Sequence, residues 1–220
     1  MSISFGSRNN PVKSFNIETK NGNLQVREAM PADFKKVVEF ETKIDIECFK
    51  ACSVLRHDPI ARSKVEQENL DFYLKYMNPK FNANSTLLIA EDKNKNIMAS
   101  FSMLPLDNCD GLTDYKTGLV NTCMVDSRYR GTGVGNKIFS KLIGTAKGEF
   151  TDLVVHSYIE SIRFYKKAGF DFLNKMNQEQ KSLLNIIKKR RIDFNWIEVM
   201  HKPLEGNSRW WKRIAAEMRL

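Results

Sequence analysis

The chain has 220 residues, 42% of them hydrophobic, and 35 Lys or Arg against 26 Asp or Glu give a formal net charge of +9. This length suits one compact domain with extensions, and the composition is ordinary for a globular protein. No apolar run reaches the roughly 18–20 residues that a bilayer-spanning helix requires, so we expect no membrane partner.

The N-terminus and the cysteines favour a cytoplasmic protein. Residues 1–8 lack the basic start and the apolar stretch of a secretory signal. The spacing of Cys48, Cys52, Cys109 and Cys123 matches neither a disulfide framework nor a paired metal site. We therefore expect buried or half-buried free thiols, no metal, and a reducing compartment.

In the first half of the chain, a polar extension over residues 1–23 precedes the domain and has room for one short strand near 14–19. A short strand follows at Leu24–Glu28. Pro31 opens an amphipathic helix over 32–50, since proline suits the first helical turn. A second helix begins after Asp58-Pro59 and ends before Pro79.

In the second half, strands alternate with helices. Two apolar runs around the polar turn 92–96 predict a hairpin, and Gly148 and Gly169 are placed to end helices. The expected strands are Thr86–Glu91, 97–104, 118–125, 153–156, 170–173 and 194–201, and the expected helices are 133–147, 159–168 and a basic insert near 177–191. This order predicts a mixed α/β domain over residues 24–204, followed by a basic and aromatic tail over 205–220.

A glycine-rich loop, Arg130-Gly131-Thr132-Gly133-Val134-Gly135, joins an apolar strand to an amphipathic helix. Glycine lets the backbone turn sharply and approach a ligand, and the N–H groups of a helix N-terminus favour a phosphate. A dinucleotide or kinase glycine pattern requires a third glycine where Asn136 stands, and a Walker A loop requires a different spacing and a Lys-Ser/Thr pair. A tight turn without a ligand remains the alternative.

Two motifs here resemble the GNAT superfamily of N-acetyltransferases. The loop is similar to the family's Q/R-x-x-G-x-G/A signature, and Ser161-Ile-Arg-Phe-Tyr165-Lys-Lys-Ala-Gly169-Phe170 resembles the second cofactor motif. The resemblance extends over about residues 24–204. It implies one central, mostly antiparallel sheet of six to seven strands with helices on both faces.

The resemblance also implies a cofactor and site residues. Acetyl-CoA would pair its pantetheine arm with backbone groups of Met124 and Val125. The pyrophosphate would lie on the N–H groups from Gly131 to Asn136. Tyr165 would give a proton to the departing thiolate, a role that a phenol with a pKa near 10 can perform; the alternative for Tyr165 is packing in the core.

This chain departs from the family in two places that bear on function. Tyr158 stands where the family often has Asn, so we expect it to bind the cofactor arm through different contacts. The strand 118–125 lacks the acidic residue that some members use as a base. His156 is our first candidate for a base, because its ordinary pKa near 6.5 suits proton transfer at neutral pH. Weaker candidates are Glu41, Glu47 and Asp126, since carboxylates on helices and turns are usually solvated.

Three functional hypotheses follow. The first is transfer of acetyl from acetyl-CoA to a primary amine, of a small molecule or a protein, by direct attack in a ternary complex. The second is a catalytically weak or inactive acyl-CoA-binding protein with a role in binding or assembly. The third specifies an RNA-linked amine such as aminoacyl-tRNA. Residues 175–220 hold eleven Lys or Arg against five Asp or Glu, and the basic segment 181–191 and the tail Arg209-Trp-Trp-Lys-Arg213 combine cations with aromatics. A homodimer is left open.

Overall fold

The computed structural model describes residues 12–48, 55–77, 85–105, 117–172 and 197–204. The chain divides into two compact units. The first unit comprises Met1–Ser102 and Thr122–Leu142, and the second comprises Met103–Asn121 and Ile143–Leu220. The expected insert near 177–191 and the tail from 205 lie outside the described residues.

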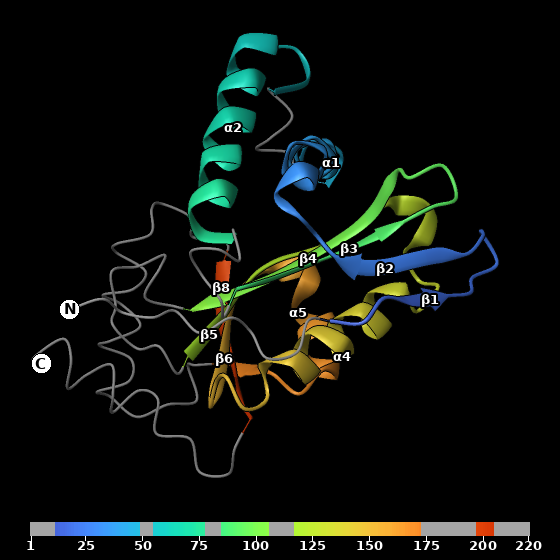
Figure 1. Ribbon diagram of the computed structural model, residues 1–220. Coiled ribbons are helices and arrows are strands. Elements are labelled where there is room, and N and C mark those ends of the chain that lie inside the picture. The colour runs from blue at the N-terminus through green and yellow to red at the C-terminus, as the bar shows by residue number, and fades with distance from the viewer. Residues whose placement is uncertain (1–11, 49–54, 78–84, 106–116, 173–196, 205–220) are drawn as a thin grey trace, which may run out of the picture. The chain divides into compact units, whose positions relative to one another are not determined.

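The described strands form a mixed α/β sheet in the order β1-β2-β3-β4-β5-β6-β8-β7 (Figure 1). The β5–β6 pair is parallel, whereas the registers of β1–β2, β2–β3, β6–β8 and β7–β8 are antiparallel. The fold class expected from the sequence, a single mostly antiparallel sheet flanked by helices, is confirmed. The short strand β1 brings the described sheet to eight strands.

In the first unit, the outer strands β1 and β2 are partly exposed, whereas the inner strands β3 and β4 are buried. β1 (Phe15–Ile17) and β2 (Leu24–Glu28) form a hairpin, and β2 also pairs in antiparallel register with β3 (Thr86–Glu91). Every residue of β3 and of β4 (Ile97–Pro105) is buried. A strand that is apolar on both sides is expected where helices cover both faces of a sheet.

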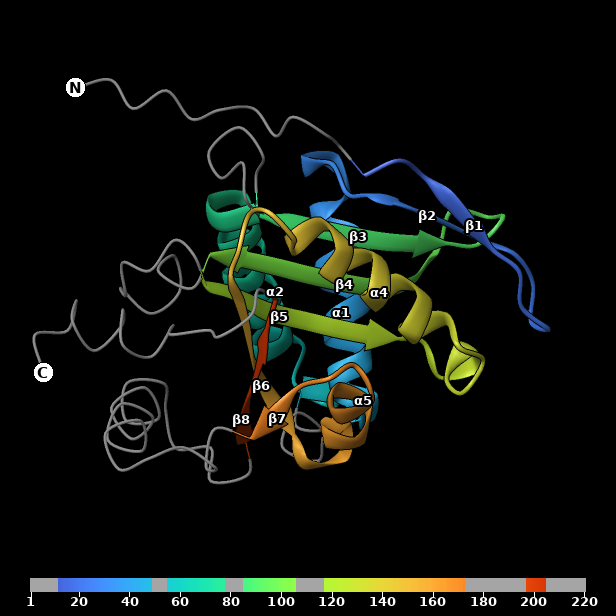
Figure 2. The same ribbon diagram turned by 90° about the horizontal axis from the view of Figure 1, so that it is seen from below.

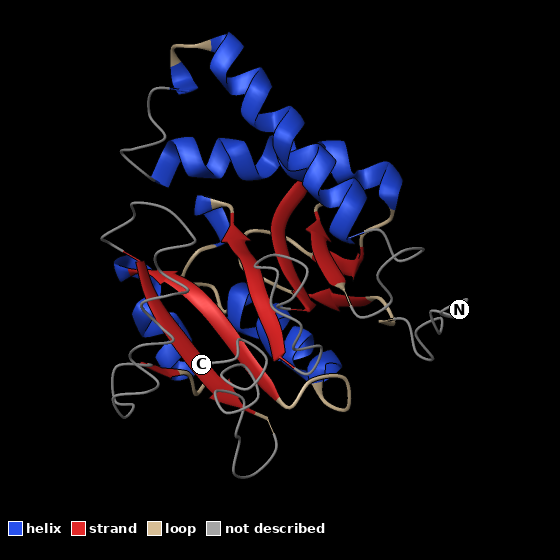
Figure 3. Ribbon diagram, turned by 90° about the vertical axis from the view of Figure 1, so that its left-hand side faces the viewer, coloured by secondary structure: helices blue, strands red, loops and turns tan. Residues whose placement is uncertain are grey.

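Helices cover both faces of the first unit's strands. Pro31–Asp33 forms a short helical turn, η1, that leads into α1 (Phe34–Cys48). α2 (Pro59–Phe72) packs against α1 (Figure 3), and its first turn is capped by the Asp58 carboxylate, which accepts from the N–H groups of Ile60 and Ala61. The first part of α4 (Val134–Ala146) lies on the opposite side of β3 and β4 from α1 (Figure 2).

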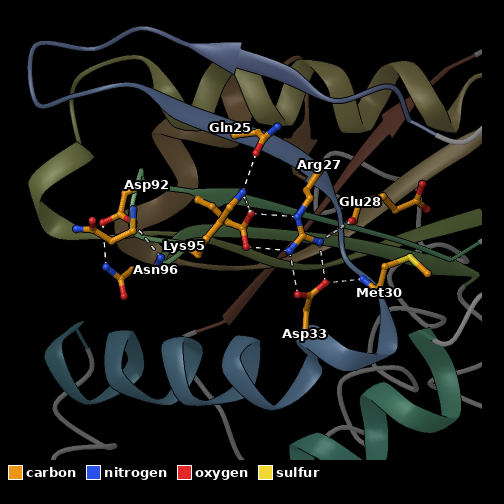
Figure 4. A network of polar contacts seen from close by, with 10 residues as sticks. Gln25, Arg27, Glu28, Met30, Asp33, Asp92, Lys95 and Asn96 are labelled. Atoms are coloured by element: carbon orange, nitrogen blue, oxygen red, sulfur yellow. Dashed lines mark hydrogen bonds and ion pairs between the residues drawn. The ribbon is translucent and has the colours of Figure 1, made fainter.

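Arg27 fastens β2, β3 and the start of α1 together. Its guanidinium contacts the Asp33 carboxylate at 2.7 and 2.9 Å and the Glu91 carboxylate at 2.8 and 3.0 Å (Figure 4). Such bidentate pairs are the stronger kind of ionic hydrogen bond. They hold the pKa of the Asp33 carboxyl below its usual value. The network therefore fixes where α1 begins relative to the sheet edge.

In the second unit, β6 (Asp152–Tyr158) is the central strand. Its residues Asp152–Val155 pair in parallel with Thr117–Val120 of β5 (Thr117–Val125), and its other edge pairs with β8 (Ile197–Pro203). α5 (Ile162–Lys167) follows a short turn at Ile159–Ser161, and β7 (Asp171–Phe172) pairs with β8. Met124 and Val125 therefore lie beyond the end of the register in which β5 pairs with β6.

Cys48 corrects one expectation from the sequence. The helical spacing placed its thiol with the apolar face of α1, and a buried or half-buried thiol was expected. Cys48 is exposed, while Cys123 is half-buried. Cys48 is the last residue of α1, and its Sγ accepts from the exposed Arg130 guanidinium at 3.0 Å instead of packing in the core.

Candidate functional site

The end of β5 is anchored by Asp126. Its backbone N–H donates to the Met98 carbonyl at 2.9 Å, and its carboxylate accepts from the Arg128 N–H at 3.1 Å and the Arg128 Nε at 2.9 Å. The Lys43 Nζ lies 3.6 Å from the same carboxylate. These contacts, the hydrogen bond from Arg128 first, hold the pKa of Asp126 below its usual value. Asp126 is thus an ionised structural residue, which suits it poorly to accept a further proton.

The glycine loop has the backbone that a phosphate cradle requires. Gly131 and Gly133 adopt φ values of +73° and +86°, in the left-handed region that favours glycine. A Cβ added at either position would meet no atom within 4 Å, so the space beside the loop is open. The loop runs directly into α4, whose first-turn N–H groups have no partner within the helix.

Side chains next to the glycines hold this loop against the protein core. The Thr132 hydroxyl donates to the Tyr129 carbonyl at 2.7 Å. Val134 and Ile138 are fully buried and hold the start of α4 against the sheet. Gly135 and Asn136 are half-buried and exposed, respectively. The loop is therefore supported on its inner side, and its backbone faces open space.

Arg130 does not extend its charge into that space. Its Nε donates to the Val125 carbonyl at 2.8 Å, and its Nη2 lies 3.0 Å from the Cys48 Sγ. The side chain thus folds back from the loop onto the end of β5 and the end of α1. Val125, expected to contact the pantetheine arm through its backbone, is itself half-buried.

The β1–β2 hairpin also holds the loop, a contact that the sequence analysis did not foresee. Asn21, at the tip of this hairpin, donates through its Nδ2 to the Arg128 carbonyl. The Tyr129 hydroxyl in turn donates to the Asn21 carbonyl at 3.2 Å. Tyr129 is 6% exposed. The only sequence signal for this contact was the turn at Asn21-Gly22-Asn23, which says nothing about its partner.

Three of the expected site residues belong to the second unit. His156 and Tyr158 lie on β6, opposite Val199 and Ile197 of β8 in the antiparallel register, and both are half-buried. Tyr165 lies on α5 and is 6% exposed. Met124, Val125 and residues 130–136 lie together in the first unit.

The second motif forms a compact aromatic turn around Tyr165. The rings of Tyr165 and Phe170 lie 5.8 Å apart, and those of Tyr165 and Phe164 lie 5.1 Å apart, both edge to face. The Phe170 N–H donates to the Tyr165 carbonyl at 3.0 Å. Gly169 makes this turn possible with a φ of +88°. The motif therefore packs the tyrosine ring between two aromatic neighbours, an arrangement compatible with both a core residue and a proton donor.

Of the three carboxylates considered as weaker base candidates, Glu41 is distinguished by its burial. Glu47 is exposed and lies 3.7 Å from the Lys43 Nζ, and Asp126 is held ionised as described above. Glu41 is 6% exposed and accepts from the Tyr73 hydroxyl at 2.7 and 2.8 Å and from the Ser100 hydroxyl at 2.7 Å. Burial raises the pKa of Glu41 to about 7. The general rule that helix carboxylates are solvated fails here.

The fold and the loop together define an acyltransferase-like α/β protein, and the comparisons with known proteins agree. The model of the family described as "Acetyltransferase (GNAT) family" matches residues 52–170, more than half of the chain. The chain therefore belongs to the GNAT acetyltransferase family. The match contains the glycine loop and the Tyr165 motif, whereas α1 and Glu41 lie before it.

Solved structures of acetyltransferases share this fold. A GNAT-family acetyltransferase of Staphylococcus aureus Mu50 matches with a TM-score of 0.55 at 16% identity, covering 83% of this chain and 99% of that one. A GCN5-related N-acetyltransferase of Kribbella flavida matches with a TM-score of 0.54 at 20% identity, covering 82% and 98%. A comparison with curated proteins finds no match. Among the described helices, none has the length and apolar character to cross a bilayer.

Proposed function

We propose that this protein is an acetyl-CoA-dependent N-acetyltransferase that moves an acetyl group to a primary amine by direct attack in a ternary complex. The observation that carries the proposal is the glycine loop: two left-handed glycines with open space beside them, continuous with the N-terminus of α4. Membership of the GNAT family gives that loop its ligand class.

The residues present fit acetyl-CoA, which supplies the acetyl thioester when bound. The backbone N–H groups from Gly131 to Asn136 hold the pyrophosphate, where the helix dipole adds to the attraction. The pantetheine arm is proposed to add as a strand to the backbone of Met124 and Val125, and their position beyond the part of β5 that pairs with β6 supports this. The Val125 carbonyl also accepts from the Arg130 Nε at 2.8 Å. Tyr158 replaces the family's frequent Asn at the same arm.

Tyr165 donates the proton that the departing thiolate takes up. A phenol can supply a proton to a thiolate and recover one from solvent. The aromatic turn around Tyr165 holds the ring in one orientation. His156, half-buried on β6, is proposed as a base for the attacking amine.

The test is acetyl-CoA binding measured by calorimetry on the full chain. A glutamate side chain at position 133 meets no protein atom at its Cβ, but its negative charge would lie against the pyrophosphate. We therefore expect Gly133→Glu to abolish binding. Gly133→Gln has the same size and the same backbone strain without the charge, so we expect weaker but measurable binding. Gly144→Glu adds the same charge at an exposed position on α4 and leaves binding unchanged. A wild-type protein that binds no acyl-CoA overturns the proposal.

A binding protein without catalysis is the second candidate, favoured by one observation. β5, from Thr117 to Val125, carries no acidic residue to act as the amine's base. Thiol release with a panel of amines separates the two candidates. Bound acetyl-CoA with no turnover on any amine supports the second.

The acceptor is proposed only as an amine of a small molecule or a protein. An RNA-linked amine rests on the basic segments 181–191 and 209–213, which lie outside the described residues. RNA retention with a steep salt dependence supports that acceptor, and no retention at low salt counts against it. We propose a cytoplasmic location from the cysteine usage. A homodimer stays a prediction. The division into an extension over 1–23, a domain over 24–204 and a tail over 205–220 also stays a prediction.

A further inference from the structure

We propose that Glu41 takes up the proton that the acceptor amine must lose, acting as a positioning residue through Tyr73 and Thr122. This inference rests on the proposed transferase function and assigns the amine's proton to Glu41 in place of His156. It needs no acidic residue on β5. The relay residues Glu41, Tyr73 and Thr122 all belong to the first compact unit.

The polar cluster that carries the inference joins one helix, one turn and two strands. Glu41 comes from α1 and Tyr73 from the turn after α2, while Ser100 lies on β4 and Thr122 on β5. The Tyr73 hydroxyl bridges both Glu41 oxygens at 2.7 and 2.8 Å, and the Thr122 Oγ1 lies 3.5 Å from the Tyr73 hydroxyl. A path of oxygens therefore runs from β5 to the buried carboxylate, and its Thr122–Tyr73 step, at 3.5 Å, is the longest and must shorten for a proton to pass.

Thr122 connects this path to the proposed cofactor strand. It stands two residues before Met124, whose backbone we assign to the pantetheine arm. Thr122 is 8% exposed, the largest exposure in the path from Thr122 through Tyr73 to Glu41. The outer end of the path is thus at β5, where the reacting carbon of a bound thioester would be reached.

The backbone places Tyr73 in the path through an uncommon turn. Residues Tyr73–Met77 continue α2 as a π-helical turn, a rare geometry that is frequent at functional sites. This turn carries the tyrosine away from the half-exposed α2 surface and buries it at 2% exposure. Phe34 of α1 packs on the ring at 5.7 Å, so the hydroxyl is held toward Glu41.

The charges around Glu41 leave it able to take a proton near neutral pH. The groups that face it are the hydroxyls of Tyr73 and Ser100, and the carboxyl of Asp45 one helical turn away. No cation appears among them in the described part of the chain. Burial, as the main cause, raises the pKa of Glu41 to about 7 and that of Asp45 to about 6.

The proton balance of the step is closed. An ammonium nitrogen gives its proton to the Thr122 oxygen, Thr122 passes its own to the Tyr73 oxygen, and Tyr73 passes its own to the Glu41 carboxylate. The free amine then forms the C–N bond while the C–S bond breaks, and the thiolate takes the proton from Tyr165. The nitrogen's second proton and the proton on Glu41 then leave to solvent, and Tyr165 recovers a proton from solvent before the next cycle.

The experiment compares pH profiles of kcat/KM, read as thiol release from acetyl-CoA with spermidine, lysine and a lysine-containing peptide as probes. In the wild type we expect the rate to rise with pH through about 7. Glu41→Gln should lower kcat about 100-fold and remove that limb, since general base catalysis contributes on this scale. Tyr73→Phe should remove the same limb. Glu39→Gln, the same change at an exposed position of α1, should leave the profile unchanged.

Two further readouts keep the outcomes distinct. An infrared band of a protonated buried carboxyl should titrate in the wild type and be absent in Glu41→Gln, whatever the substrate. Acetyl-CoA binding by Glu41→Gln should match the wild type. Superimposable pH profiles of an active wild type and Glu41→Gln overturn the relay alone. A wild type that binds acetyl-CoA but releases no thiol overturns the relay together with catalysis, and one that binds no acetyl-CoA overturns the proposed function itself.

Discussion

The Tyr129 hydroxyl donates to the Asn21 carbonyl at 3.2 Å, joining residues 108 positions apart in the chain. This bond ties the tip of the β1–β2 hairpin to the short turn before the glycine loop. Asn21 strengthens the tie by donating to the Arg128 carbonyl. The β1–β2 hairpin at the edge of the sheet therefore supports the proposed phosphate site. Neither Asn21 nor Tyr129 belongs to the backbone segment Gly131 to Asn136 that would contact the phosphate.

Tyr129→Phe should weaken acetyl-CoA binding up to about five-fold, because a net hydrogen bond contributes about 1 kcal/mol. The free energy of unfolding should fall by a similar amount. Calorimetry and denaturant titration measure the two effects. Tyr76→Phe is the control, since in the described part of the chain no hydrogen bond is made by the Tyr76 hydroxyl. Equal behaviour of the two variants would show that the hairpin does not support the loop.

Tyr165→Phe should reduce turnover with little change in acetyl-CoA affinity. The substitution retains the ring that packs on Phe164 and Phe170 and removes only the hydroxyl. Steady-state thiol release and calorimetry on the same preparation compare the two quantities. Unchanged kcat would remove the proton-donor role and leave Tyr165 as a core aromatic.

The stability of the fold should fall as pH rises between about 4.5 and 7. The pKa of Glu41 is raised by burial from its ordinary 4.5 to about 7, so in this range the folded protein holds a proton that the unfolded chain has released. The contribution is complete below the lower value and lost above the upper one. It amounts to about 3.5 kcal/mol at most, from about 1.4 kcal/mol for each pKa unit.

Glu41→Gln should flatten much of this dependence, measured by urea unfolding at several pH values. A smaller slope should remain, because burial also raises the pKa of Asp45, to about 6. Glu39→Gln should keep the wild-type slope, since Glu39 is exposed. A Glu41→Gln slope equal to that of the wild type would contradict the buried titration.

Gly118→Ala should destabilise the second unit by about 1–3 kcal/mol, as overpacking of a core does. A Cβ at Gly118 would lie 2.8 Å from Leu153 Cδ2 and 3.0 Å from Phe150 Cδ2. Thermal or denaturant unfolding tests this. Gly144→Ala, at an exposed position of α4, should instead raise the free energy of unfolding by about 0.5–1 kcal/mol through helix propensity. A neutral Gly118→Ala would mean that Phe150 moves aside.

Periodicity and turn residues were sufficient to predict most elements. The strand Thr86–Glu91 has the predicted bounds, and the turn after it closes through mutual hydrogen bonds between Asp92 and Asn96. Helix ends were predicted within a few residues, because proline and glycine mark them chemically. The π-helical turn at Tyr73–Met77 was not predicted, since its residues continue the helical pattern of α2 without interruption.

Within the candidate site, the sequence predicted geometry only at the glycine loop. Glycine spacing indicated the loop because left-handed φ values restrict the residue type. Glu41 was ranked low, because burial of a helix carboxylate depends on which hydroxyls the sheet presents to it. Tyr73, Ser100 and Thr122 come from three separate elements, and nothing local in the sequence reveals that they converge.

The folded-back side chain of Arg130 bears on how the loop should respond to ionic strength. Attraction between exposed charges is screened over about 10 Å at 0.1 M salt, whereas N–H groups in contact with an anion are affected far less. The Arg130 guanidinium is hydrogen-bonded to the Val125 carbonyl and the Cys48 Sγ. The loop's contacts with a phosphate are therefore expected to come from its backbone N–H groups. The contribution of these N–H contacts to affinity should therefore depend less on salt than a direct ion pair between Arg130 and a phosphate would.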